Sequence, residues 1–137
     1  MAENPRLMPM HLTVVLPATS AGNALRVVIH APHFNFEIVG MVVTDQTGIT
    51  ANATNFATIA AEIGATPRVA CTTTTATVSF AAGVPRRVAP TETEANRRGV
   101  PDDPIAVNIT KAASGVATNV NLAVTIEYIW GYSQVAT

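Results

Sequence analysis

His30, His33 and Glu37 lie close together in the sequence and carry side chains that can bind a metal ion. On an extended strand, positions 30 and 33 point to opposite faces, and Pro32 stands between them. A shared metal ion would therefore require a bend at this point. We interpret these residues as polar groups at the end of a strand, and we expect neither a metal ion nor a cofactor.

The possible nucleophiles are Cys71 and many Ser and Thr hydroxyls. The sequence contains no Gly-x-Ser-x-Gly turn, no glycine-rich phosphate loop and no pair of carboxylates within an apolar stretch. Cys71 is the one cysteine, so it cannot form an internal disulfide, and its Thr-rich surroundings favour a small buried residue. We expect that the protein is not an enzyme.

Four of the seven arginines fall in the segment 81–103, which lacks a clear alternation and contains several prolines and glycines. They occur as two pairs, Arg86–Arg87 and Arg97–Arg98. Four acidic residues in the same segment balance their charge: Glu92, Glu94, Asp102 and Asp103. This neutrality favours ion pairs, within the chain or with a neighbouring subunit, over a nucleic-acid site. A solvated loop is the alternative, although long irregular loops in small domains commonly contact partners.

The composition indicates an all-β protein with few charges. Hydrophobic residues make up 48% of the chain, charged residues only 12%, and the net charge is -1. Such a chain has no field that would attract nucleic acid or a membrane surface, and its surface suits contact with other subunits. Val, Ile and Thr are abundant whereas Leu and Lys are scarce, a balance that favours strands over helices.

Alternating apolar residues predict the elements that would position these groups. We expect strands over residues 12–16, 24–31, 34–43, 68–71, 75–80, 84–88, 105–110 and 120–130. Residues 56–63 fit either a helical stripe or a strand, and we favour the strand. The last strand should point six residues into the core: Val120, Leu122, Val124, Ile126, Tyr128 and Trp130. These elements predict one antiparallel β-sandwich over residues 12–137, most simply a jelly roll.

Two apolar features predict self-association. Residues 1–11 read as an extended arm whose apolar side chains, Leu7, Met8 and Met10, need a surface to cover them. In the third strand, alternation places one apolar set opposite another, Val39, Met41 and Val43 against Phe36, Ile38 and Val42. Since a two-layer sandwich buries only one face of each strand, we expect a second subunit or the arm on the other face.

The sequence "PDDPIAVNITKAASGVATNVNLAVTIEYIWG" resembles the closing strands of the small jelly-roll proteins that decorate tailed-phage capsids, and "FEIVGMVVTD" resembles one of their early strands. The segment 81–103 is longer than that pattern. The resemblance implies a capsid decoration, or cement, protein. Such a protein sits on the outer surface of the virion as a homotrimer and bridges subunits of the major capsid protein.

A recognition module of a tail fibre, binding a carbohydrate or a receptor, is the alternative on the same fold. It would need exposed aromatic rings, which the sequence offers sparingly.

Overall fold

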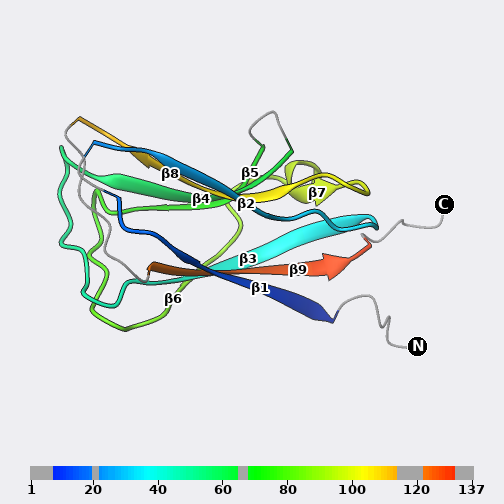
Figure 1. Ribbon diagram of the computed structural model, residues 1–137, viewed down its shortest axis with the longest axis horizontal. Helices are drawn as coiled ribbons and strands as arrows, with labels where there is room; N and C mark the ends of the chain where they lie inside the picture. The colour runs from blue at the N-terminus through cyan, green and yellow to red at the C-terminus, as the bar shows by residue number, and fades with distance from the viewer. Residues whose placement is uncertain (1–7, 20–21, 65–67, 114–121, 132–137) are drawn as a thin grey trace.

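Two antiparallel β-sheets packed face to face make up the protein (Figure 1), seen in a computed structural model that describes residues 8–19, 22–64, 68–113 and 122–131. One sheet has the order β1-β9-β3-β6, with β7 also paired to β3, and the other has the order β2-β8-β4-β5. The strands are β1 (Pro9–Leu16), β2 (Leu25–His30), β3 (Phe36–Thr44), β4 (Ala57–Ile63), β5 (Arg68–Thr74), β6 (Arg86–Val88), β7 (Arg98–Gly99), β8 (Ile105–Lys111) and β9 (Leu122–Trp130).

This strand order is that of a jelly roll. The two last long strands, β8 and β9, each lie between strands from the first half of the chain, one in each sheet. Every pairing is antiparallel. Eight strands in two layers of four, joined by such crossovers, define the fold, and the short strand β7 adds a fifth to the first sheet. The sequence-based prediction of an all-β jelly-roll sandwich is confirmed.

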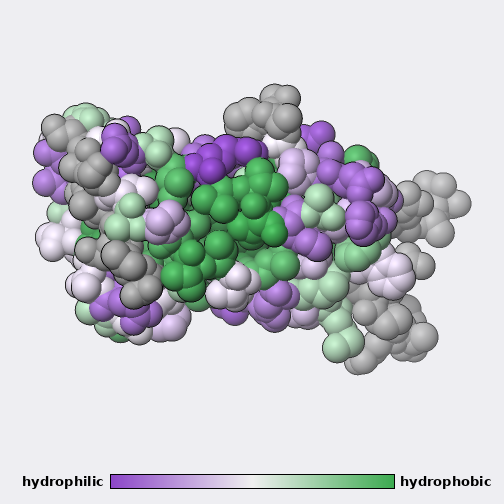
Figure 2. Space-filling model, viewed as in Figure 1, coloured by the Kyte–Doolittle hydropathy of each residue, from purple (hydrophilic) through white to green (hydrophobic). Residues whose placement is uncertain are grey.

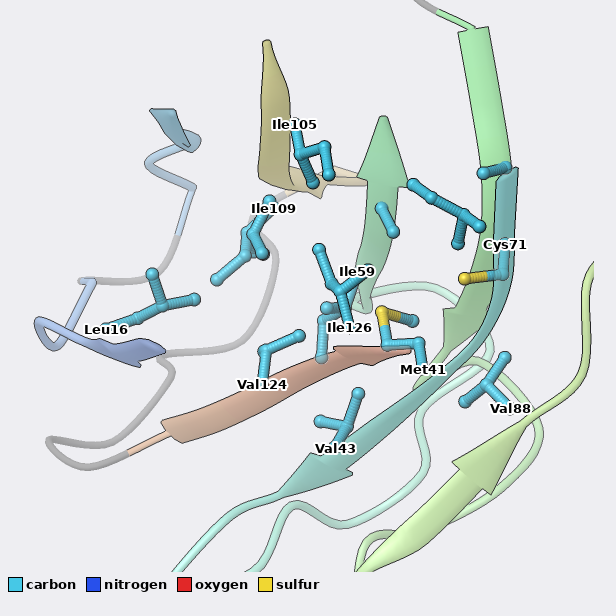
Figure 3. Close-up of a cluster of buried hydrophobic side chains, with 14 of the residues drawn as sticks. Leu16, Met41, Val43, Ile59, Cys71, Val88, Ile105, Ile109, Val124 and Ile126 are labelled. Carbon is cyan, nitrogen blue, oxygen red and sulfur yellow. The ribbon is translucent and has the colours of Figure 1, made fainter. Parts of the chain in front are cut away.

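The core lies between the sheets and is built from the alternating apolar residues of the central strands. Ile59 of β4 and Ile109 of β8 are paired neighbours in one sheet and point toward the opposite sheet, which contributes Ile126 of β9 to the same core (Figure 3). All three are fully buried. Each such side chain stabilises the fold by roughly 1.5–3 kcal/mol relative to exposure. Period-two patterning therefore accounts for most of the sheet packing.

Most predicted strands are present, and two differ from expectation. Residues 56–63 form β4, so the strand interpretation was right. Residues 75–80 do not form a strand: a turn follows β5, in which Ala76 N donates to Thr74 Oγ1 and Ala57 N donates to Thr75 Oγ1. Hydroxyl groups that bond nearby backbone favour turns over ladders. β1 begins at Pro9, so residues 9–11, expected in the arm, pair with β9.

A β-bulge at Val39 changes which residues of β3 face the core. The pairing of β3 with β9 skips one residue between Ile38 and Gly40. Met41 and Val43 are consequently fully buried on the same face as Ile38, and Val42 is half-buried on the outer face. The predicted opposition of Val39, Met41 and Val43 to Phe36, Ile38 and Val42 is wrong, because an inserted residue reverses the alternation after it.

The end of β9 also departs from the pattern. Leu122, Val124, Ile126 and Tyr128 are buried as expected, whereas the Trp130 side chain is 55% exposed. The strand reaches beyond the core at this end, where the edge of the Phe34 ring packs against Trp130, with ring centroids 5.8 Å apart. Val120 lies outside the described residues.

Residues 81–103 close one side of the sandwich, the side bordered by β3 and β5. The segment pairs with β3 through β6, crosses to β5 where Thr91 N donates to Ala70 O, and forms the 3-10 helix η2 (Glu94–Arg97). It then returns to β3 as β7. Within the described ranges, no helix is long and apolar enough to cross a membrane.

Candidate interaction surface

The outer face of the first sheet carries a buried carboxylate covered by arginine. Glu127 lies on the inner strand β9, and Arg87 lies on the edge strand β6, with β3 between them. Arg87 Nη1 donates to Glu127 Oε2 at 2.7 Å. His11 Nε2 of β1 lies 3.8 Å from Glu127 Oε1. The hydrogen bond from Arg87 lowers the pKa of Glu127 although burial raises it, and the same bond raises the pKa of Arg87.

A second covered carboxylate lies on β3. Arg98 Nε donates to Glu37 Oε1 at 3.3 Å, and Arg97 Nη1 lies 3.8 Å from Glu37 Oε2. Arg98 also pairs with Glu94, four residues before it in η2. Arg97 Nη1 donates to Ile38 O as well. The loop 81–103 therefore covers the outer face of β3 with charge-assisted hydrogen bonds.

Arg86 completes the set of four predicted arginines and behaves differently. Its guanidinium lies over the Phe80 ring, 4.9 Å from the centroid, a cation–π contact. The structure thus brings Arg87, Arg97 and Arg98 onto two carboxylates of their own chain. Arg87 remains 68% exposed at its side chain, so it can also face a partner. An intermolecular role for these arginines stays a prediction.

The second sheet carries an equivalent arrangement that the sequence analysis did not identify. Glu62 of β4 is buried, and it accepts hydrogen bonds from Arg26 Nε of β2 at 3.1 Å and from Asn108 Nδ2 of β8 at 2.8 Å. Arg26 and Glu62 are charged residues within strands whose other residues are mostly apolar. Their charge is the one sequence signal that could have indicated the pair. Each outer face thus carries a buried carboxylate that is paired within the chain.

The side of the sandwich between β1 and β2 is not closed in this way. Both are terminal strands of their sheets. Their inward side chains pack against the core but stay partly exposed: Met10, Leu12 and Val14 from β1, and Leu25, Val27 and Ile29 from β2. Figure 2 shows apolar surface gathered in the middle of this view, over β1 and β2. We call these six residues the open apolar side.

The predicted arm and strand residues divide between this side and the core. Met10 belongs to the open apolar side, and Met8 is 73% exposed just before β1. Leu7 lies outside the described residues. Met41 and Val43 are core residues, and Val39 is half-buried at the bulge. The apolar surface that needs covering therefore lies at β1 and β2 and not on β3.

The residues considered for chemistry are dispersed. His33 Nδ1 lies 2.7 Å from Asp102 Oδ1 in an exposed pair, the His30 ring lies 6.5 Å from the Tyr128 ring, and Glu37 pairs with arginines. No group of three or more His, Cys, Asp or Glu residues that could hold a metal ion occurs among the residues described. Burial raises the pKa of the Cys71 thiol to about 12, which disfavours the nucleophilic thiolate.

Comparison with known proteins identified distant structural neighbours from viruses. No protein-family model matches the chain, and no curated protein matches it. The tobacco streak virus coat protein has 16% sequence identity and a TM-score of 0.37, over all of this chain and 95% of that one. A structure of infectious bursal disease virus, Gx strain, has 13% identity and a TM-score of 0.30, over all of this chain and 42% of that one. Identities and TM-scores this low support no functional conclusion.

Proposed function

We propose that this protein is a virion structural protein of a tailed phage, a decoration protein that binds the outer surface of the capsid and stabilises it by bridging subunits. The observation that carries the proposal is the open apolar side of a small jelly roll. It is an extended surface of aliphatic side chains rather than a set of polar groups that converge on one reacting atom. Extended apolar surfaces on small soluble domains mark protein–protein contacts.

The interior and the outer faces also support a structural role in the virion. Hydrophobic side chains of both layers fill the space between the sheets. A jelly roll that binds a ligand in its interior would enclose the ligand in this space. The carboxylates of the outer faces are satisfied within the chain by Arg87, Arg97, Arg98 and Arg26. Such a domain offers rigid surfaces for contact, which is what a protein that bridges capsid subunits needs.

Residues 101–131 resemble the closing strands of decoration proteins. From this resemblance we infer that the protein binds the capsid. The segment it covers includes β8 and β9, the inner strands of the two sheets. The major capsid protein is accordingly the partner that we propose.

The experiment that tests this proposal is localisation. DNA-filled heads that lack tails, purified from cells infected with the phage that encodes the protein, are sedimented and probed with an antibody against it. We expect the protein on heads in a fixed ratio to the major capsid protein, and accessible to the antibody on intact particles. Its absence from heads together with its presence on isolated tails would contradict the proposal.

A recognition module is the second candidate, and Trp130 is the observation that favours it. Its indole is exposed beside Phe34 at one end of the sandwich, and a flat exposed ring can stack on a sugar. Titration of the protein with host-surface glycans, followed by isothermal titration calorimetry, tests this function. Saturable binding that is lost in Trp130→Ala would favour it over the capsid role.

A further inference from the structure

We infer that the open apolar side is a self-association surface, on which a second copy of this chain docks by pairing its β1 edge antiparallel to the first. This inference uses the same surface that carries the proposed function and names a second copy of the chain as the partner that docks there. It rests on the proposed function only in taking that surface as a protein–protein contact, and its test in solution needs no capsid. It begins with the difference between the two sides of the sandwich. The segment 81–103 crosses from β3 to β5 and closes one side, whereas the inward residues of β1 and β2 stay partly exposed on the other.

The backbone of β1 is suited to pairing with another strand. Its eight residues pair with β9 in one continuous register, from Pro9 against Ile129 to Leu16 against Leu122. Within the described ranges, β9 is the one strand that pairs with β1. Proteins usually block a long terminal strand with lysines, prolines, bulges or inward charges. β1 begins at Pro9, and the rest of the strand contains no lysine, no bulge and no inward charge.

The lack of charge on this surface is compatible with a second copy as its occupant. The six residues of the open apolar side are uncharged. In the segment 81–103, Arg87, Arg97 and Arg98 pair with carboxylates on β3 and β9, and Arg86 lies over the Phe80 ring. An apolar surface that meets its own copy brings no like charges together. A charged or polar partner would leave its groups facing these side chains without hydrogen bonds.

Antiparallel pairing also suits a copy of the same strand. Two identical edges that run in opposite directions are related by a two-fold axis, so each contact occurs twice. The first sheets of both copies would join through β1, and the two open apolar sides would form one continuous core. The resemblance to decoration proteins implies a trimer. The edge geometry instead leads us to a dimer as the unit of association.

The test is the mass of the full chain by sedimentation equilibrium across a wide range of concentration. We expect twice the chain mass of 14.3 kDa for the wild type. Val14→Lys should weaken association at least tenfold, because its ammonium group can reach water in the monomer but would be buried in the dimer. The matched control is Val69→Lys, a half-buried valine on the terminal strand β5 at the closed side, which should dimerise like the wild type.

A second variant applies if Val14→Lys does not fold. Val27 of β2 belongs to the open apolar side, and Val69 on β5 remains its control. Val27→Lys should weaken the dimer and Val69→Lys should not. Amide hydrogen exchange in β1, but not in β5, should slow as concentration rises. A monomeric or trimeric wild type, or equal association of Val27→Lys and Val69→Lys, would overturn the inference.

Discussion

Arg87 donates a hydrogen bond to Glu127 beside the α-carbon of Gly40. A Cβ added at Gly40 would lie 3.3 Å from Glu127 Oε2 and 3.8 Å from Arg87 Nη1. The glycine therefore leaves the space in which a buried carboxylate on β9 meets an arginine from β6. This relationship shows how a carboxylate on the outer face of β9 is buried and paired within the chain.

The pair makes the stability of the protein depend on pH. Because the folded pKa of Glu127 is lowered, its contribution is present above the ordinary carboxylate pKa of about 4.3 and is lost as pH falls through the lowered value. We expect Glu127→Gln to be less stable than the wild type at pH 7. The difference should shrink as the pH is lowered to about 3, measured by urea unfolding.

Glu92→Gln is the control for this prediction, since Glu92 lies in the segment 81–103 and accepts a hydrogen bond only from exposed Asn96 among the contacts seen. Its unfolding free energy should follow the wild type at both pH values. An undiminished difference between Glu127→Gln and the wild type at low pH would show that the carboxylate is not held in its charged form.

Gly99 is required by the ring of Phe36. A Cβ at position 99 would overlap this buried ring, and overpacking of this kind costs about 1–3 kcal/mol. We expect Gly99→Ala to lower the melting temperature by several degrees, measured by circular dichroism. Phe36→Leu should cost less in the Gly99→Ala background than in the wild type, because the smaller side chain relieves the overlap. Additive effects would contradict direct contact between the two positions.

Cys71 should be inert in the folded protein. Its thiol is buried, and burial raises its pKa to about 12. A chromogenic thiol reagent at pH 8 is expected to react with about one equivalent after unfolding in denaturant, and far more slowly before it. Reaction of the native protein at the rate of the unfolded chain would place the thiol at the surface.

Trp130 provides a direct check on the end of β9. The single indole is 55% exposed, so its fluorescence should be quenched by acrylamide nearly as well in the native protein as in urea. The expected emission is that of a tryptophan in water. A blue-shifted, poorly quenched signal would instead place the ring in an apolar environment, as alternation along the strand predicted.

The fold was largely predictable because period-two alternation reports which face of a strand is buried. Leu122 to Tyr128 alternate without interruption, and β9 faces the core as expected. The same rule failed at Val39, where one inserted residue reverses the faces without any sign in the composition. It failed at Trp130 because alternation gives the direction of a side chain, not how far the opposite sheet extends.

The candidate site was less predictable because its partners are distant in sequence. The neutral charge of the segment 81–103 indicated ion pairs, but which carboxylates accept them depends on the positions of β3 and β9. The open apolar side was not predictable from single strands, since β1 and β2 alternate like the covered strands. Which strands are terminal is a property of the sheet order.

We propose that the protein stabilises a capsid by binding its outer surface. The most direct measurement is the temperature at which DNA-filled heads prepared without this protein release their DNA, with and without added purified protein. We predict saturable binding at a fixed number of copies per head and a higher release temperature. Heads that bind none of the added protein, or that bind it with no change in release temperature, would contradict the account.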